Sequence, residues 1–160
     1  VSIYIRTRVP YVVTPRKHLP LIMEHLGITP DSIIYDLGCG KGDVLFAAEK
    51  FHPKKLVGFE LSPLHAWYAQ IKSKILGSEV RIYRRDFFTA DISDADIIYL
   101  FLVQSVVERI WDKINKEAKP GTKVVVLANT IPSPGVRRIE LHKNNPSGSG
   151  GLFIYTVGGK

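Results

Sequence analysis

The sequence predicts an α/β fold: a Rossmann-like, doubly wound sheet of seven strands, mostly parallel, with an antiparallel hairpin at its C-terminal end. Short apolar runs alternate along the chain with segments whose apolar residues recur at helical spacing, which is typical of βαβ units. A glycine-rich turn, residues 36–42, directly follows the first of these runs. The run 97–102 is apolar throughout, as expected for a central strand buried on both faces.

The individual elements follow from these patterns and from turn signals. Strands are expected at 33–36, 55–60, 80–83, 96–102, 123–127, 137–142 and 152–157. The turn cluster 144–151 predicts that the last two strands form the hairpin. Helices are expected at 17–26, 43–51, 62–76 and 106–114. Gly27 is a common stop signal for the first helix, while Ser62 is the expected N-cap and Pro63 the first residue of the third.

Composition indicates one globular domain over residues 1–160, because 45% of the residues are hydrophobic, 23% are charged and no linker interrupts the pattern. The single cysteine, Cys39, excludes an internal disulfide framework and a cysteine-based zinc site. We therefore expect a reducing compartment and a cytoplasmic protein. No run approaches the roughly 20 apolar residues of a membrane span, and the five histidines are scattered without metal-ligand spacing, so no metal is expected.

The formal net charge of +7 leaves the partners open. Basic residues gather near the N-terminus and beside the predicted strands. A solvated basic surface and an anionic partner such as nucleic acid both explain this distribution. Charge alone does not choose between them.

The glycine loop, residues 36–42, has the sequence Asp-Leu-Gly-Cys-Gly-Lys-Gly. Dinucleotide folds use the spacing G-x-G-x-x-G, which lets the backbone approach a pyrophosphate. Here the third glycine comes one residue early and an acid precedes the first. This arrangement favours S-adenosylmethionine, which carries no phosphate and needs close backbone approach and carboxylates for its hydroxyl and ammonium groups.

Three acids follow three successive predicted strands. Asp36, Glu60 and Asp86 all fall at carboxyl ends, where open α/β sheets bind their ligands. Glu60 could accept both ribose hydroxyl hydrogen bonds, and Asp86 could accept from an adenine amino group. Any one of these acids could be a solvated strand end, but three in register with a glycine loop indicate a nucleoside site.

Six segments occur in an order that resembles the class I, seven-strand methyltransferases that use S-adenosylmethionine. These segments are 10–15, 34–42, 57–60, 86–88, 101–102 and 119–122. More narrowly, the chain resembles the compact archaeal broad-specificity protein-lysine methyltransferases and their mitochondrial relatives, from about Val9 to the hairpin. The glycine loop is common to many methyltransferases, whereas Pro-Tyr-x-x-Thr at 10–14 is far more specific.

The resemblance implies a set of cofactor-binding residues. They are Tyr11, Thr14, Asp36, Gly38, Cys39, Gly40, Glu60, Leu61, Asp86, Phe87 and Phe101. In this scheme the segment 1–27 covers the cofactor and residues 28–160 form the Rossmann-like core. Tyr11 and Thr14 cover the methionine end, Thr14 binding its carboxylate. Tyr11 and Phe101 border the transferable methyl group and position it, although taken alone one is a packing tyrosine and the other a core aromatic.

The resemblance implies methyl transfer to protein lysine side chains, by direct displacement and without a catalytic base. The Asn/Asp-Pro-Pro-Tyr motif that holds weakly nucleophilic amides is missing after the fourth strand. A lysine amine needs only to lose its proton, which desolvation and the adjacent sulfonium favour. The substrate entrance is expected at Asn129, Thr130 and Pro132, where the relatives carry an acidic segment.

One departure and two alternatives remain. Lys41 stands where relatives often have aspartate, which leaves its effect on cofactor affinity open. The acceptor could instead be RNA or a small molecule, which the positive charge favours, although no RNA-binding module is appended. The chain could also be a non-catalytic cofactor-binding protein, which the intact loop and acids argue against. A monomer is expected.

Overall fold

The computed structural model describes residues 12–133, 136–141 and 150–158. They contain one seven-stranded sheet with the strand order β3-β2-β1-β4-β5-β7-β6. The strands are β1 (Ile33–Leu37), β2 (Lys55–Glu60), β3 (Arg81–Arg84), β4 (Ile97–Leu100), β5 (Lys123–Leu127), β6 (Arg137–Glu140) and β7 (Gly151–Thr156). The five strands β1 to β5 are parallel, whereas β7 runs antiparallel to both β5 and β6. The predicted fold class and hairpin are confirmed.

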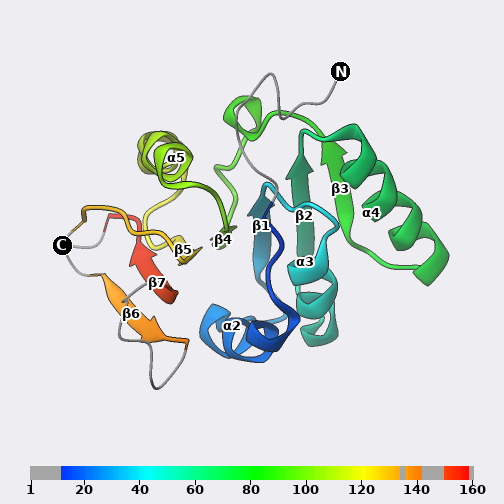
Figure 1. The fold of residues 1–160 in the computed structure, drawn as a ribbon, viewed down its shortest axis with the longest axis horizontal. Coiled ribbons are helices and arrows are strands. Elements are labelled where there is room, and N and C mark those ends of the chain that lie inside the picture. Colours follow the sequence, from blue (N-terminus) through cyan, green and yellow to red (C-terminus); the bar gives the residue numbers. More distant parts are fainter. Residues whose placement is uncertain (1–11, 134–135, 142–149, 159–160) are drawn as a thin grey trace.

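Helices cover both faces of this sheet (Figure 1). They are α2 (Leu19–Leu26), α3 (Asp43–Ala48), α4 (Pro63–Leu76) and α5 (Gln104–Glu117). Single 3-10 turns are η1 (Arg16–His18), η2 (Glu49–Phe51) and η3 (Phe87–Thr89). Buried residues of α2, α3 and α4 belong to one hydrophobic cluster, and those of α5 belong to the cluster on the opposite face.

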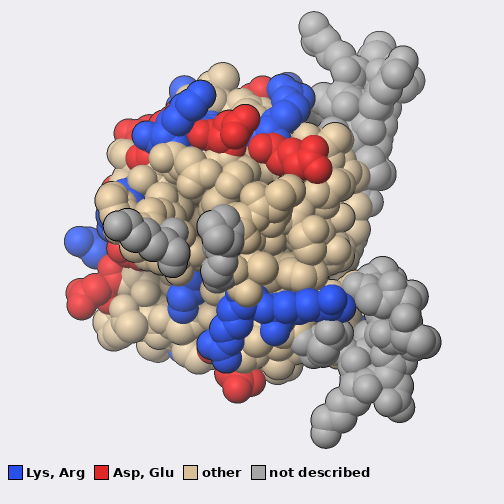
Figure 2. Space-filling view, turned by 90° about the vertical axis from the view of Figure 1, so that its left-hand side faces the viewer, with Lys and Arg blue, Asp and Glu red and all other residues tan. Residues whose placement is uncertain are grey.

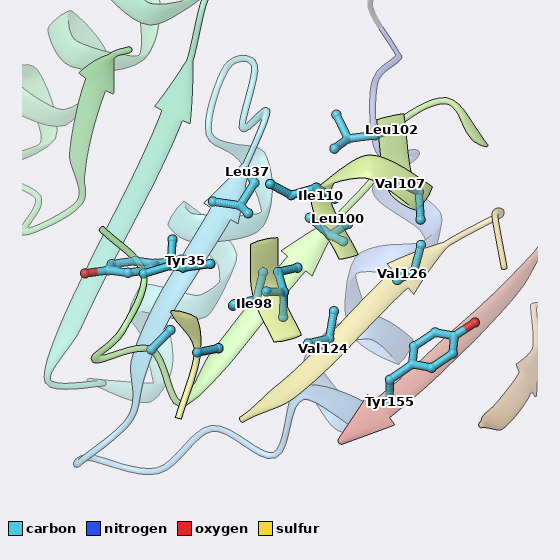
Figure 3. Close-up of a cluster of buried hydrophobic side chains, with 14 of the residues drawn as sticks. Tyr35, Leu37, Ile98, Leu100, Leu102, Val107, Ile110, Val124, Val126 and Tyr155 are labelled. Carbon is cyan, nitrogen blue, oxygen red and sulfur yellow. The ribbon is translucent and has the colours of Figure 1, made fainter. Parts of the chain in front are cut away.

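Successive side chains along a strand point to opposite faces of the sheet, and this separates the two clusters. Tyr35 and Leu37 of β1 point to the α5 side, while Ile34 beside them points to the α2–α3–α4 side. Figure 3 shows the α5-side cluster, in which Ile110 meets the side chains of the central strands. Because both faces are buried, the central strands are apolar at consecutive positions, which is why 97–102 read as a continuous run.

The observed element ends differ from the expected ones by a few residues. The helix expected at 43–51 ends as an α-helix at Ala48 and finishes in the 3-10 turn η2. The strand expected at 96–102 is the shorter β4. Ser62 is the N-cap residue of α4 by position, but its side chain makes no capping hydrogen bond. Its backbone N–H instead donates to Glu60 Oε1 at 2.7 Å, which ties the helix start to the end of β2.

The strand order reverses between β1 and β4. β2 and β3 lie on one side of β1, and β4, β5 and the hairpin lie on the other. The two strands flanking this reversal carry their connections to opposite faces, which leaves a crevice beyond their carboxyl ends. The chain therefore places its glycine loop at the position where open α/β sheets bind ligands.

Candidate functional site

A cavity of about 320 Å³, counting the part open to solvent, lies beyond the carboxyl ends of β1 and β4. The lining residues come from the segment before η1, the glycine loop, α3 and β4. They are Val12, Val13, Thr14, Asp36, Gly38, Cys39, Gly40, Lys41, Asp43, Val44, Tyr99 and Phe101. The structure thus brings together six of the predicted cofactor-binding residues.

The glycine loop takes a tightly turned path. Gly38, Gly40 and Gly42 have φ angles of 87°, 54° and 79°, which favour glycine. A Cβ on Gly38 would lie 2.8 Å from Leu102 Cδ2, so this position also needs glycine for space. The alternating glycines of the sequence therefore reflect alternating positive φ angles.

Glu60 anchors this loop to β2. Its Oε2 accepts the backbone N–H of Gly40 at 2.9 Å, and its Oε1 accepts that of Ser62 at 2.7 Å. The side chain is 9% exposed. Each carboxylate oxygen can accept a further hydrogen bond. Ribose binding by Glu60 stays a prediction, and the structure shows that the residue also orders the loop.

Cys39 is buried at the base of the loop, against Gly58 of β2. A Cβ on Gly58 would lie 2.5 Å from Cys39 Sγ and 2.8 Å from Leu45 Cδ1. Burial, with the charges of Asp36 and Glu60, raises the pKa of the Cys39 thiol well above its ordinary value. The thiol is therefore a packing group at neutral pH, and the glycine in β2 is what admits it.

Asp36 is the most strongly perturbed acid of the site. It is 3% exposed, and within the described ranges no group donates a hydrogen bond to its carboxylate. Burial raises the pKa of Asp36 well above its ordinary value, and the neighbouring charges of Glu60 and Asp43 raise it further. A buried carboxylate without a donor is costly unless a ligand compensates it. Asp36 is therefore suited to meet a cationic or donor group of a ligand.

Thr14 and Tyr99 form another part of the cavity wall, and Tyr99 of β4 is the register partner of Asp36 of β1. Thr14 Oγ1 and the Tyr99 hydroxyl lie 3.0 Å apart within a hydrogen bond, and the two residues are 8% and 1% exposed. Burial raises the pKa of Tyr99, so the hydroxyl stays protonated. Tyr99 was not among the predicted site residues. The available signal was a hydroxyl inside an otherwise aliphatic buried strand, since such a group needs a partner.

The remaining predicted cofactor residues lie further along the strand ends. Phe101 is half-buried and lines the cavity beyond β4. Phe87 is half-buried beside the loop, its Cε1 3.9 Å from a Cβ built on Gly38. Leu61, after β2, is 38% exposed. Asp86 is exposed, does not line the cavity, and accepts the Phe88 N–H at 2.9 Å as the cap of η3. The adenine role of Asp86 stays a prediction.

The predicted substrate entrance follows β5 at the same end of the sheet. Asn129 Nδ2 donates to the Leu102 carbonyl, and the Thr130 carbonyl accepts from Gln104 Nε2 at 2.6 Å. These bonds hold the segment against the start of α5, while Pro132 is exposed beside it. Tyr11, the other predicted positioning residue, lies outside the described residues.

The family of this chain is shown by its similarity to known proteins. Residues 36–137 match the model of the ANTKMT methyltransferase domain. A protein-lysine N-methyltransferase of Saccharolobus islandicus (strain REY15A) is 39% identical over 120 residues, which are 73% of this chain and 74% of the relative. The chain belongs to the ANTKMT methyltransferase domain family.

Two further comparisons extend this assignment. The mouse (Mus musculus) adenine nucleotide translocase lysine N-methyltransferase is 28% identical over 128 residues, 76% of this chain but 53% of the relative. The chain thus spans about half the length of that relative. An RNA methyltransferase of Salinibacter ruber, solved with S-adenosyl-L-homocysteine, has a TM-score of 0.80 and 26% identity, covering 91% of this chain and 94% of that one.

This member of the ANTKMT methyltransferase domain family is therefore an enzyme that uses S-adenosylmethionine. The residues of the cavity fit that cofactor. S-adenosylmethionine carries a cationic sulfonium and an ammonium group, and the cavity wall holds Asp36 and Asp43. The predicted family, enzyme class and cofactor are confirmed.

Lys41, the departure from the family pattern, also lines the cavity and has its ammonium group near α4. Its Nζ lies 5.2 Å from the centroid of the Tyr68 ring of α4, a cation–π contact. The lysine therefore contributes backbone to the loop and places its charge toward α4. Across the described part of the chain, no group of His, Cys, Asp and Glu is arranged to hold a metal ion.

Proposed function

We propose that this methyltransferase transfers the methyl group of S-adenosylmethionine to the side-chain amines of lysines in proteins. The observation that carries the proposal is the end of β4. There Phe101, an apolar side chain, borders the acid-lined cavity, and the neighbouring positions Leu100 and Leu102 are buried. Such a rim excludes water but offers no polar group to activate an amide nitrogen. The S. islandicus and mouse relatives, both lysine N-methyltransferases by name, support the same acceptor.

The residues of the site act by positioning and by excluding water. The cofactor supplies an electrophilic methyl group on a sulfonium. In the proposed mechanism no residue of the chain acts as a dedicated base. Asp36 faces the cationic groups, Thr14 closes the methionine end, and Phe101 keeps the approach of the amine dry. Desolvation favours the neutral amine, which is the nucleophilic form. The rate then comes from alignment of amine, methyl carbon and sulfur.

RNA is the second candidate acceptor. The likeness to the S. ruber RNA methyltransferase and the net charge of +7 favour it. Figure 2 shows the face formed by α5 and the hairpin, where Lys and Arg gather in one belt and mix with Asp and Glu in another. α5 itself carries three basic residues, Arg109, Lys113 and Lys116, against three acids, Glu108, Asp112 and Glu117. The helix therefore offers no net positive surface for a phosphate backbone.

A cytoplasmic monomer belongs to the same proposal. The buried, unpaired Cys39 supports a reducing compartment. Within the described parts of the chain, no helix has the length and apolarity that crossing a bilayer requires.

The acceptor can be identified by labelling. The chain is incubated with methyl-labelled S-adenosylmethionine and a cell extract, and the product is divided between nuclease and protease digestion. Label that resists nuclease, is released by protease and elutes as methyl-lysine after acid hydrolysis is the expected result. Label that vanishes with nuclease would reject the lysine acceptor in favour of RNA.

The cofactor site is tested on its own by calorimetry. Glu60→Ala removes the acceptor for two backbone N–H groups and the predicted ribose contacts, so cofactor binding should weaken by about 1–3 kcal/mol. Glu108→Ala, an exposed acid on α5, is the matched control and should bind normally. Equal affinity of both variants would refute the role of Glu60.

A further inference from the structure

The helix α4 turns its large apolar side chains away from the core. Its buried positions are Ala66, Ala69 and Ser73, at 1%, 0% and 8% exposure. Its outward positions carry Leu64 at 68%, Trp67 at 63%, Tyr68 at 49% and Ile75 at 78% exposure. Water contacts the larger apolar groups and the sheet contacts the smaller ones. Such an inverted helix indicates a surface that meets another apolar phase.

The outward residues form a single stripe. At 3.6 residues per turn, five side chains fall within an arc of about 100° on the side opposite Ala66, Ala69 and Ser73. The stripe, here called the α4 face, consists of Leu64, Trp67, Tyr68, Ile71 and Ile75. Lys74 borders this arc on one side and Lys72 on the other, so basic residues flank the apolar stripe.

The surroundings of the α4 face are basic. Segment 61–85 carries five basic residues, Lys72, Lys74, Arg81, Arg84 and Arg85, against one acid, Glu79. Of these, Lys72 lies 3.6 Å from Asp43 Oδ1, whereas Lys74, Arg81 and Arg84 are exposed. Glu49, beneath the helix end, accepts hydrogen bonds from Ser78 and from the Glu79 backbone.

A groove runs beside the N-terminal half of the helix. It encloses about 920 Å³, counting the part open to solvent, and is lined by Pro63, Leu64, Ala66, Trp67, Gln70 and Arg84. Apolar side chains thus lie next to a guanidinium. A phospholipid presents the same pair of features, acyl chain and phosphate.

We propose that the α4 face docks this enzyme on the surface of an anionic lipid bilayer. Aliphatic side chains as exposed as Leu64 and Ile75 gain nothing from stacking on bases, which argues against nucleic acid. In a two-fold dimer built on this face, the same basic border would lie against itself, which argues against a second copy. An anionic bilayer satisfies the apolar stripe and its lysine and arginine border together.

Docking would bring the active site close to the membrane. Lys41 of the glycine loop lies over the ring of Tyr68, so the loop and the α4 face adjoin. A methyltransferase held in this way would act on acceptors at the bilayer surface. The proposal concerns binding of the chain to lipid and does not depend on which acceptor is methylated.

The test uses the full chain and vesicles of phosphatidylcholine with a minority of phosphatidylglycerol, compared with phosphatidylcholine alone. Co-sedimentation should show binding to the anionic vesicles that weakens as salt is raised. The chain has two tryptophans, and Trp111→Phe leaves Trp67 as the single tryptophan fluorophore. Its emission should shift to shorter wavelength on anionic vesicles, because the ring enters an apolar environment.

Paired variants separate the two components of the surface. The double variant Leu64→Ser/Ile75→Ser should lower vesicle binding by about tenfold or more. Its control is Val136→Ser, which removes a side chain of 42% exposure beside β6 at the opposite edge of the sheet. Lys74→Ala should lower binding by about fivefold, since each basic residue near an anionic surface contributes to this extent. Lys116→Ala on α5 is its control.

Three outcomes would overturn the proposal. One is the absence of a preference for anionic vesicles. Another is unchanged vesicle binding by Leu64→Ser/Ile75→Ser, with cofactor binding by calorimetry confirming that the variant is folded. The third is a lipid-free dimer in sedimentation velocity that dissociates in this double variant, which would assign the α4 face to a second copy.

Discussion

The two long helices, α4 and α5, have the same length but make opposite use of their side chains. α5 buries Val107, Ile110 and Ile114 completely against the sheet and shows balanced charges outside. α4 buries two alanines and a serine and shows leucine, tryptophan and isoleucine outside. The first pattern is that of a helix selected to stabilise the fold. The second indicates that most of the apolar area of α4 does not contribute to folding.

The largest loss of stability is expected for a substitution on the buried side of α5. Ile110 is fully buried in the cluster of Figure 3, so Ile110→Ala removes apolar contacts and leaves a cavity. The free energy of unfolding should fall by about 2–5 kcal/mol. Urea denaturation followed by circular dichroism measures the change. A loss below about 1 kcal/mol would show that α5 packs less closely than the structure indicates.

At α4 the buried side should tolerate enlargement poorly. Ala69 is fully buried against β2 and β3, where the helix lies close to the sheet. Ala69→Leu should therefore destabilise the protein by about 1–3 kcal/mol through overpacking. The same urea experiment tests this, with Lys74→Leu as the control that places a leucine on the exposed side of α4. Equal stability of the two variants would contradict the close approach.

The buried carboxyl of Asp36, in β1, should make the stability of the protein depend on pH. Its folded pKa is raised by burial, so the folded state retains the proton to higher pH than the unfolded state does. Stability is therefore highest below the ordinary aspartate pKa and is lost as pH rises toward the folded value. Without cofactor, Asp36→Asn should raise stability at pH 7, because the variant removes a buried carboxyl that must ionise.

Lowering the pH provides the control for this effect. Near the ordinary aspartate pKa of about 3.9 the gain from Asp36→Asn should shrink, because the native carboxyl is then protonated as well. Urea denaturation at both pH values measures the difference. A gain that does not depend on pH would place the effect in packing instead of charge.

The smallest effect is expected on the outer side of α4. Ile75 is 78% exposed, so Ile75→Ser should change the free energy of unfolding by no more than about 0.5 kcal/mol. Ile75→Ser is measured beside Ile110→Ala. The ratio of the two losses in the free energy of unfolding shows how much less an isoleucine contributes on the outer side of α4 than on the buried side of α5. A loss at Ile75 as large as that at Ile110 would mean that another part of the chain covers the α4 face.

Much of the fold followed from local sequence signals. The glycine loop, the acids at strand ends and the hairpin turn are short-range patterns, since each depends on neighbouring residues and on the period of a strand or helix. That is why seven strands were expected within a few residues of their observed ends. The family and its cofactor followed from the same short segments.

Other features needed the tertiary structure because their partners are distant in sequence. Tyr99 joins Thr14 across 85 positions, and Glu60 holds Gly40 across 20, so neither bond has a local signature. Gly58 admits Cys39 only because β1 and β2 lie side by side.

The sequence by itself determined which residues lie in strands and helices and which chemistry the glycine loop serves, because periodicity and turn geometry are local properties. Which side of α4 meets the core was decided only by the tertiary structure. Helical spacing groups Leu64, Trp67, Ile71 and Ile75 on one side, and hydrophobicity alone would place that side inward. The sheet instead accepts Ala66 and Ala69, because close approach of helix to strand requires small side chains.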